Sequence, residues 1–188
     1  MTEVLIIGCE GQLGSALQRG QRSGLRTTSI DIDELDIVRR ADTVSYIRQL
    51  EPKWVVNCAA YTNVDKAEVE QDVAFVVNRD AVENIGLGCR EAGARLIHIS
   101  TDFVFDGKKG KPYSPDDEPN PLNVYGASKL AGEQVLCELF TQYSMIIRTA
   151  WLYSADGNNF VKTMLRLMAE QESLSVVDDQ YGSPTYAE

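Results

Sequence analysis

The sequence has 188 residues, of which 44% are hydrophobic and 24% charged, and its formal charge at pH 7 is −10. A chain of this length can bury roughly 70% of its unfolded surface, and its strong negative charge excludes nucleic acid as a partner, because phosphate backbones recruit basic surfaces. No apolar run is long enough to span a bilayer, and residues 1–8 lack the basic leader of a signal peptide, so we expect no membrane partner and a cytoplasmic location.

Strand-like and helix-like segments alternate along the whole chain. Short β-branched apolar runs predict strands at 3–8, 25–31, 53–60, 94–100, 143–153 and 173–179. Segments with helical spacing predict helices at 11–21, 41–52, 73–93, 125–140 and 159–171, the third of them capped by Gly93. A stretch rich in Gly, Pro and Asp predicts a loop at 102–123. This alternation is typical of an α/β fold, a doubly wound parallel sheet (Rossmann fold) with helices on both faces.

The cysteines and the single histidine are interpreted as core residues. Cys9, Cys58, Cys89 and Cys137 show no metal-ligand spacing, so we expect reduced thiols that pack as small hydrophobic groups. His98 lies inside the fourth predicted strand, where packing in the core is expected rather than chemistry.

A glycine-rich turn joins the first predicted strand to the first predicted helix. Gly8, Gly11 and Gly14 follow the spacing G-x-x-G-x-x-G. Such a turn lets the backbone approach a pyrophosphate closely, and the N-terminus of the following helix offers unpaired N–H groups and partial positive charge. The strand before and the helix after the turn therefore predict a dinucleotide cofactor.

The second predicted strand bears on the choice between NADH and NADPH. Asp31 ends this strand, where a carboxylate can accept hydrogen bonds from the adenosine ribose and would repel a 2′-phosphate, as would Glu10. Arg39 and Arg40 follow and could reach such a phosphate, although we favour their interpretation as the solvated start of a helix. Both cofactors stay open, with a slight preference for NADH or dual use.

A tyrosine and a lysine stand one helical turn apart at the start of the fourth predicted helix. Tyr125 and Lys129 share a helix face, and a nearby ammonium stabilises a phenolate and lowers the pKa of the phenol. Ser100 and Thr101 end the preceding strand, where ligands bind in open parallel sheets. The combination predicts a proton donor for a carbonyl that receives hydride.

Seven sequence words carry a family resemblance: GCEGQLG, VVNCAAYTNVDKAE, STDFVFDG, PLNVYGASKLAGE, RTAWLY, GNNFVKTMLRLM and DDQYGSPTYAE. They extend through nearly the whole chain, which resembles the extended short-chain dehydrogenase/reductases. Within them it looks like the members that reduce a dTDP-4-keto-6-deoxy sugar, dTDP-4-dehydro-L-rhamnose, to dTDP-L-rhamnose with NADPH or NADH.

The resemblance implies a role for each matching residue. The implied catalytic residues are Thr101, Tyr125 and Lys129. The implied substrate contacts are Thr101, Asp102 and Trp151, although Trp151 is equally well interpreted as a core aromatic residue. Besides Tyr125 and Lys129, the implied cofactor contacts are Gly8, Gly11, Gln12, Leu13, Asp31, Asp36, Ile37, Ala59, Ala60 and Tyr61.

Two departures from the family pattern set further expectations. Some members hold a magnesium ion at a dimer contact through two glutamates, whereas this chain has Ala16 at one position and its final residue, Glu188, at the other. We therefore expect no metal site, while a homodimer stays possible. Residues 1–188 match the NAD(P)-binding domain, and the smaller substrate domain is expected to be essentially absent, so the chain is either truncated or completed by another chain.

Alternative functions stay open at this point. A non-catalytic cofactor-binding module is one, as in a regulatory subunit of methionine adenosyltransferase that resembles the same family. Another sugar-nucleotide reductase or epimerase is a second. A dehydratase is disfavoured, because Phe103 stands where such enzymes carry the second carboxylate needed for water elimination.

Overall fold

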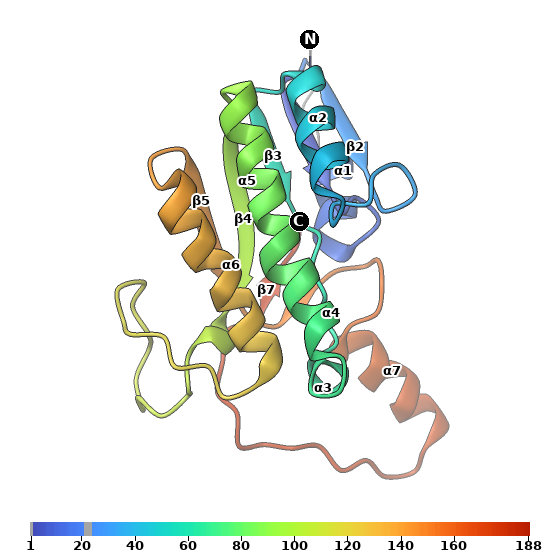
Figure 1. Ribbon diagram of the computed structural model, residues 1–188. Coiled ribbons are helices and arrows are strands. Elements are labelled where there is room, and N and C mark those ends of the chain that lie inside the picture. Colours follow the sequence, from blue (N-terminus) through green and yellow to red (C-terminus); the bar gives the residue numbers. More distant parts are fainter. Residues whose placement is uncertain (1, 21–23) are drawn as a thin grey trace.

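The computed structural model describes residues 2–20 and 24–188 and is built on a five-stranded parallel sheet (Figure 1). Its strands are β1 (Val4–Ile7), β2 (Thr27–Ile30), β3 (Trp54–Asn57), β4 (Arg95–Thr101) and β5 (Ser144–Thr149). Their order is β2-β1-β3-β4-β5, and every neighbouring pair is parallel. The predicted fold class is confirmed.

The position of β1 in this order decides where a ligand can bind. From β1 the chain builds outward to β2 on one side and later through β3, β4 and β5 on the other. Ile7 at the end of β1 is level with Ile30 of β2 and with Asn57 of β3. Ligands of open parallel sheets bind beyond the carboxyl ends of the strands at such a reversal. The segments that follow Ile7 and Asn57 therefore flank the expected site.

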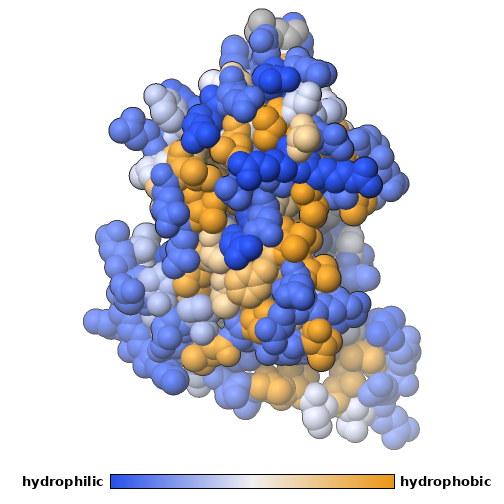
Figure 2. Space-filling view, in the orientation of Figure 1, coloured by the Kyte–Doolittle hydropathy of each residue, from blue (hydrophilic) through white to orange (hydrophobic). Residues whose placement is uncertain are grey.

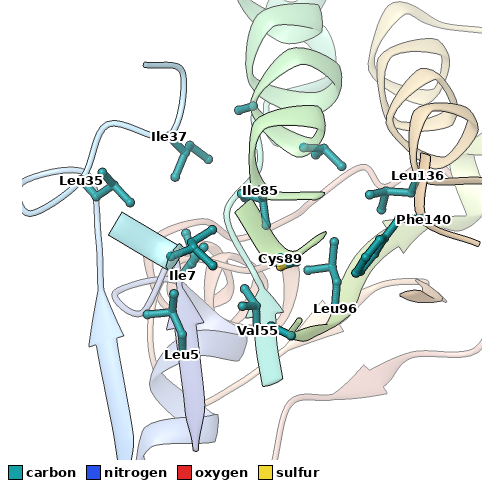
Figure 3. Close-up of a cluster of buried hydrophobic side chains, with 14 of the residues drawn as sticks. Leu5, Ile7, Leu35, Ile37, Val55, Ile85, Cys89, Leu96, Leu136 and Phe140 are labelled. Carbon is teal, nitrogen blue, oxygen red and sulfur yellow. The ribbon is translucent and has the colours of Figure 1, made fainter. Parts of the chain in front are cut away.

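Three helices lie side by side over one face of the sheet (Figure 1), namely α2 (Arg40–Leu50), α5 (Ala81–Ala92) and α6 (Val124–Phe140). Apolar side chains of the strands meet those of α5 and α6 in a single core cluster (Figure 3). Its fully buried members include Leu5, Val55, Ile85, Leu96 and Leu136. Each such side chain contributes about 1.5–3 kcal/mol through burial, so this face holds the helices in fixed positions.

The helix predicted at 73–93 contains a π-helical turn. The observed elements are α4 (Gln71–Phe75), the π-helix η1 (Val76–Asp80) and α5, which is capped by Gly93 with φ +66° as predicted. A Cβ added at Gly132 of α6 would lie 2.1 Å from the carbonyl oxygen of Asn78. The wider turn therefore contacts α6 directly, and glycine is required at that contact.

Two strand predictions near the C-terminal end are wrong. The strand predicted at 143–153 is broken by Trp151, whose φ of +48° separates β5 from β6 (Leu152–Tyr153). Residues 173–179, all of them described, form no strand, and β7 (Thr185–Tyr186) pairs with β6 instead. Val176 and Val177 are exposed. Their β propensity is not realised, because a strand needs a neighbour to pair and pack with.

The remaining helices are α1 (Gln12–Arg19), α3 (Val64–Ala67), the 3₁₀ turn η2 (Asp102–Val104) and α7 (Phe160–Glu170). Residue 21, predicted to end the first helix, lies outside the described residues. Among the helices that the structure describes, none has the length and apolar character needed to cross a membrane.

The cysteines and His98 fit their predictions unevenly. All four cysteines carry free thiols, and Cys89 is buried in the core as expected, but Cys137 on α6 is exposed. His98 is fully buried in β4, so its predicted place in the core is confirmed. Burial lowers the pKa of His98 well below its usual value and keeps the ring neutral.

Candidate active site

Each of the three glycines in the first turn has its own structural role. Gly8 adopts φ +79°, and a Cβ added there would lie 2.6 Å from the backbone nitrogen of Ala59. A Cβ added at Gly14 would lie 2.2 Å from the carbonyl oxygen of Gly8, so α1 packs tightly on the turn. At Gly11 the nearest atom would be 3.5 Å away. The backbone is thus open at Gly11, just before α1, where a pyrophosphate fits the dinucleotide pattern.

Asp31 lies beside the glycine-rich turn at the end of β2. Its carboxylate accepts hydrogen bonds from the backbone nitrogens of Glu10, at 2.9 Å, and Ile32, also at 2.9 Å. The side chain is only partly buried. A carboxylate held at this position is suited to accept hydrogen bonds from a ribose bound over the turn.

Asp36 and Ile37 are arranged differently from Asp31. The Asp36 carboxylate accepts a hydrogen bond from the backbone nitrogen of Val38 at 3.1 Å and pairs with Arg39 at 3.4 Å. The side chain of Ile37 belongs to the core cluster (Figure 3), so only its backbone is available for a cofactor contact. The contacts predicted for these two residues stay predictions.

The segment after β3 is held by two buried asparagines. Asn57 accepts a hydrogen bond from the backbone nitrogen of Ala59 at 3.1 Å. Asn78 of η1 binds both backbone groups of Tyr61, its nitrogen at 2.9 Å and its oxygen at 3.0 Å. The positions of residues 59–61 are thereby fixed next to Gly8. Sequence reasoning did not identify Asn78, whose role depends on the π-helical turn.

The first residues of α1 contact the loop that precedes α7. The Gln12 side chain accepts hydrogen bonds from Asn159 at 3.0 Å and from the Ser154 hydroxyl at 3.4 Å. Leu13 is half-buried. Because the side chain of Gln12 is engaged with this loop, its backbone is the part that remains for the predicted pyrophosphate contact.

Thr101 and Tyr125 bring two hydroxyl groups together at the carboxyl end of β4. Burial raises the pKa of Tyr125, a hydrogen bond with Thr101 acts in the opposite direction, and the charge of Asp102 raises it further. The Thr101 hydroxyl also accepts a hydrogen bond from the backbone nitrogen of Phe103 at 3.2 Å and contacts the Asp102 carboxylate at 3.2 Å. The ring of Phe103 packs edge-on against that of Tyr125 at 5.6 Å between centroids.

Lys129 follows Tyr125 by one turn of α6 and is buried, with only 2% of its surface exposed. Its amine donates a hydrogen bond to the carbonyl oxygen of Ile99 at 2.6 Å. Burial lowers the pKa of Lys129 to about 8, against the opposing effect of Glu133. The predicted lowering of the Tyr125 pKa by this amine is not found: that pKa is raised, because burial disfavours the phenolate.

Trp151 is not a core residue. Its side chain is 47% exposed, and a Cβ added at Gly182 would lie 3.1 Å from its indole ring. The left-handed backbone at Trp151 is unusual for a bulky residue, and such strain clusters at ligand-binding sites. Of its two interpretations, the core aromatic is excluded, and the substrate contact stays a prediction.

The glycine-rich turn lies at the reversal of strand order, and Thr101, Tyr125 and Lys129 lie on β4 and α6 of the same parallel sheet, which defines the class as a Rossmann-like α/β protein. The sequence model of a protein family described as "RmlD substrate binding domain" matches residues 1–188. The chain belongs to this family.

Individual relatives agree with this assignment. A dTDP-4-dehydrorhamnose reductase from Streptomyces griseus is 43% identical over 183 residues, covering 97% of this chain and 60% of that protein. A dTDP-4-keto-6-deoxy-D-glucose reductase from Streptomyces niveus is 39% identical, with 97% and 64% covered. The crystal structure of a Bacillus anthracis dTDP-4-dehydrorhamnose reductase in complex with NADP has a TM-score of 0.95 and 44% identity, and the match covers 100% of this chain and 67% of that one. The chain thus spans about three fifths of the length of the curated relatives it matches.

Proposed function

We propose that this chain carries the cofactor-binding and catalytic residues of a dTDP-4-dehydrorhamnose reductase, which converts dTDP-4-dehydro-L-rhamnose to dTDP-L-rhamnose. The observation that carries the proposal is the pair of interacting hydroxyls of Thr101 and Tyr125, together with the buried Lys129 one helical turn after Tyr125, at the carboxyl edge of the sheet that also holds the glycine-rich turn. The names of the similar proteins support the choice of substrate.

A bound nicotinamide cofactor would supply the hydride for this reaction. Thr101 holds the oxygen of the keto group through its hydroxyl, and Tyr125 transfers the phenol proton to that oxygen. Because the pKa of Tyr125 is raised, the phenol is fully protonated at neutral pH and available as a donor. The Lys129 ammonium then stabilises the phenolate that remains.

We propose that the cofactor is NADPH or NADH, bound over Gly11 with its ribose at Asp31. The fit of the glycine-rich turn supports a dinucleotide, and the similar B. anthracis protein binds NADP. The exposed Arg39, paired only loosely with Asp36, is available to a 2′-phosphate. Replacing Arg39 by Gln should therefore weaken binding of NADPH and leave that of NADH unchanged, as measured by calorimetry. Equal losses for both cofactors would contradict a phosphate contact at Arg39.

The direct test is a turnover assay of the 188-residue chain with dTDP-4-dehydro-L-rhamnose and either cofactor. We expect dTDP-L-rhamnose, identified by NMR of the product. The S. niveus relative favours a second candidate, the same reduction of dTDP-4-keto-6-deoxy-D-glucose, so that sugar is assayed in parallel. Cofactor binding without any product would instead indicate a non-catalytic module. A homodimer remains a separate prediction, which analytical ultracentrifugation of the same sample tests.

A further inference from the structure

Glu133 of α6 is a buried acid that the proposed reaction does not yet use. Only 4% of the residue is exposed. Its carboxylate accepts a hydrogen bond from Ser100 at 2.5 Å and two from Arg148, at 3.0 Å and 2.5 Å. The carboxylate thus forms an ion pair with Arg148, and such charge-assisted hydrogen bonds offset the cost of burying it.

This carboxylate lies next to the catalytic group in both sequence and space. Glu133 follows Lys129 by one helical turn and Tyr125 by two, so the three residues share one face of α6. Its partner Ser100 directly precedes Thr101 on β4, and its partner Arg148 is level with Ser100 on β5. The carboxylate therefore joins α6 to both strands at the level of the proposed site.

The groups that surround the Lys129 amine otherwise give it no negative charge. Burial raises the pKa of Cys58, at the end of β3, to about 12, and that of His98 on β4 is lowered, so both are neutral. Tyr125 is a neutral phenol, and the charge of Asp102 bears on Tyr125 rather than on the amine. In the described part of the chain, Glu133 is the acid whose charge favours a protonated Lys129, and Arg148 contacts both oxygens of the same carboxylate.

We propose that Glu133 is a positioning residue that acts through Lys129: its fixed negative charge keeps the buried amine protonated at neutral pH. The inference rests on the proposed function for its consequence in turnover, since a neutral amine would not stabilise the Tyr125 phenolate. It concerns the charge of Lys129 itself, which is measurable without any reaction.

Two substitutions separate this role from a purely structural one. Glu133→Gln removes the negative charge and leaves Arg148 unbalanced, whereas Arg148→Gln breaks the same ion pair but leaves the charge of Glu133 unbalanced. Nuclear magnetic resonance of isotope-labelled lysine side chains follows the titration of Lys129, which is assigned by its absence in Lys129→Met. We expect the titration midpoint to fall by about one pH unit in Glu133→Gln and to rise in Arg148→Gln, because a nearby charge of either sign shifts such a group.

The proposal is overturned if the Lys129 midpoint shifts in the same direction in both variants, or if it shifts in neither variant. Both variants lose the ion pair, so an effect of that loss alone would be the same in each. Should Glu133→Gln fail to fold, Arg148→Gln decides: a raised midpoint supports the proposal and an unchanged one overturns it. Failure of the proposed function has a different signature, namely a wild-type chain that yields no sugar product while its lysine titration follows the expected pattern.

Discussion

The core face of the sheet and the C-terminal region of the chain differ sharply in how well their side chains are covered. On the face beneath α2, α5 and α6 the core is closed, and Leu136 has no exposed surface. The C-terminal part of the chain from Trp151 onward, the exposed end, is covered poorly: α7 has no buried residue, and Leu165 is 64% and Met168 65% exposed. Figure 2 shows hydrophobic residues at the surface in the lower right, where Figure 1 places α7.

This difference separates Tyr125 and Lys129, which the proposed chemistry uses, from Trp151, whose substrate contact is a prediction. Tyr125 and Lys129 stand on α6, which packs against the closed core and cannot move without disrupting it. Trp151 and the loop at 154–159 belong to the exposed end, where the loop is held to α1 by polar contacts and the indole of Trp151 lies beside Gly182. Substitutions in the closed core should therefore change stability, and those at the exposed end should change it little.

The largest effect is expected from truncating the core of α6. Leu136→Ala should lower the free energy of unfolding by about 2–5 kcal/mol, because it leaves a cavity in a fully packed site. The matched control, Leu165→Ala on α7, should change it by less than about 0.5 kcal/mol. Chemical denaturation of both variants measures the difference. Similar losses would show that α7 is packed as firmly as α6 and would remove the contrast between the two regions.

A smaller effect concerns the burial of Lys129 and depends on pH. The pKa of this amine is about 8 in the folded chain and near its ordinary value of 10.5 when unfolded. Below pH 8 the Lys129 amine is protonated in both the folded and the unfolded state. Burial of the ammonium there lowers the free energy of unfolding by about 3 kcal/mol. Above pH 8 the folded state loses its proton first, and stability rises until about pH 10.5. Lys129→Met should therefore have a higher free energy of unfolding than the wild type at pH 7, and chemical denaturation at several pH values should show that this difference shrinks toward pH 10. A difference that does not depend on pH would contradict a buried charge.

The smallest effect is expected at the ion pairs between α1 and the exposed end. Arg19 contacts Asp156 and also Glu188, at 2.6 Å for the latter, and all three side chains are well exposed. Arg19→Gln should therefore cost at most about 1 kcal/mol in the free energy of unfolding, and the loss should diminish in high salt. Denaturation at two salt concentrations tests this, and a larger loss that salt leaves unchanged would mean that these contacts are part of the closed core.

Local patterns in the sequence were sufficient to predict the sheet, most helices and the glycine-rich turn. Each depends on short-range chemistry: β-branched runs, helical spacing and glycines where the backbone must approach closely. The break at Trp151 and the missing strand at 173–179 depend instead on which segments find a neighbour, which apolar composition does not encode.

Within the site, the sequence allowed prediction only of the residues that follow the four-residue spacing of α6. Tyr125 and Lys129 share a face as expected, and Glu133 continues the same four-residue spacing, so this signal was available for it as well. Asn78 had no such signal, because a π-helical turn cannot be read from residue types. The direction of the Tyr125 pKa was missed because it depends on burial, which outweighs the effect expected from a neighbouring amine.

The central claim is that the phenol of Tyr125 donates the proton, whereas the glycine-rich turn provides most of the binding of the cofactor. Its most direct test compares the rate of sugar reduction and the cofactor dissociation constant in the wild type and in Tyr125→Phe. We predict a loss of about 10²–10⁴-fold in rate with an unchanged dissociation constant, because only the transferred proton is removed. A variant that reduces the sugar at the wild-type rate would contradict the account.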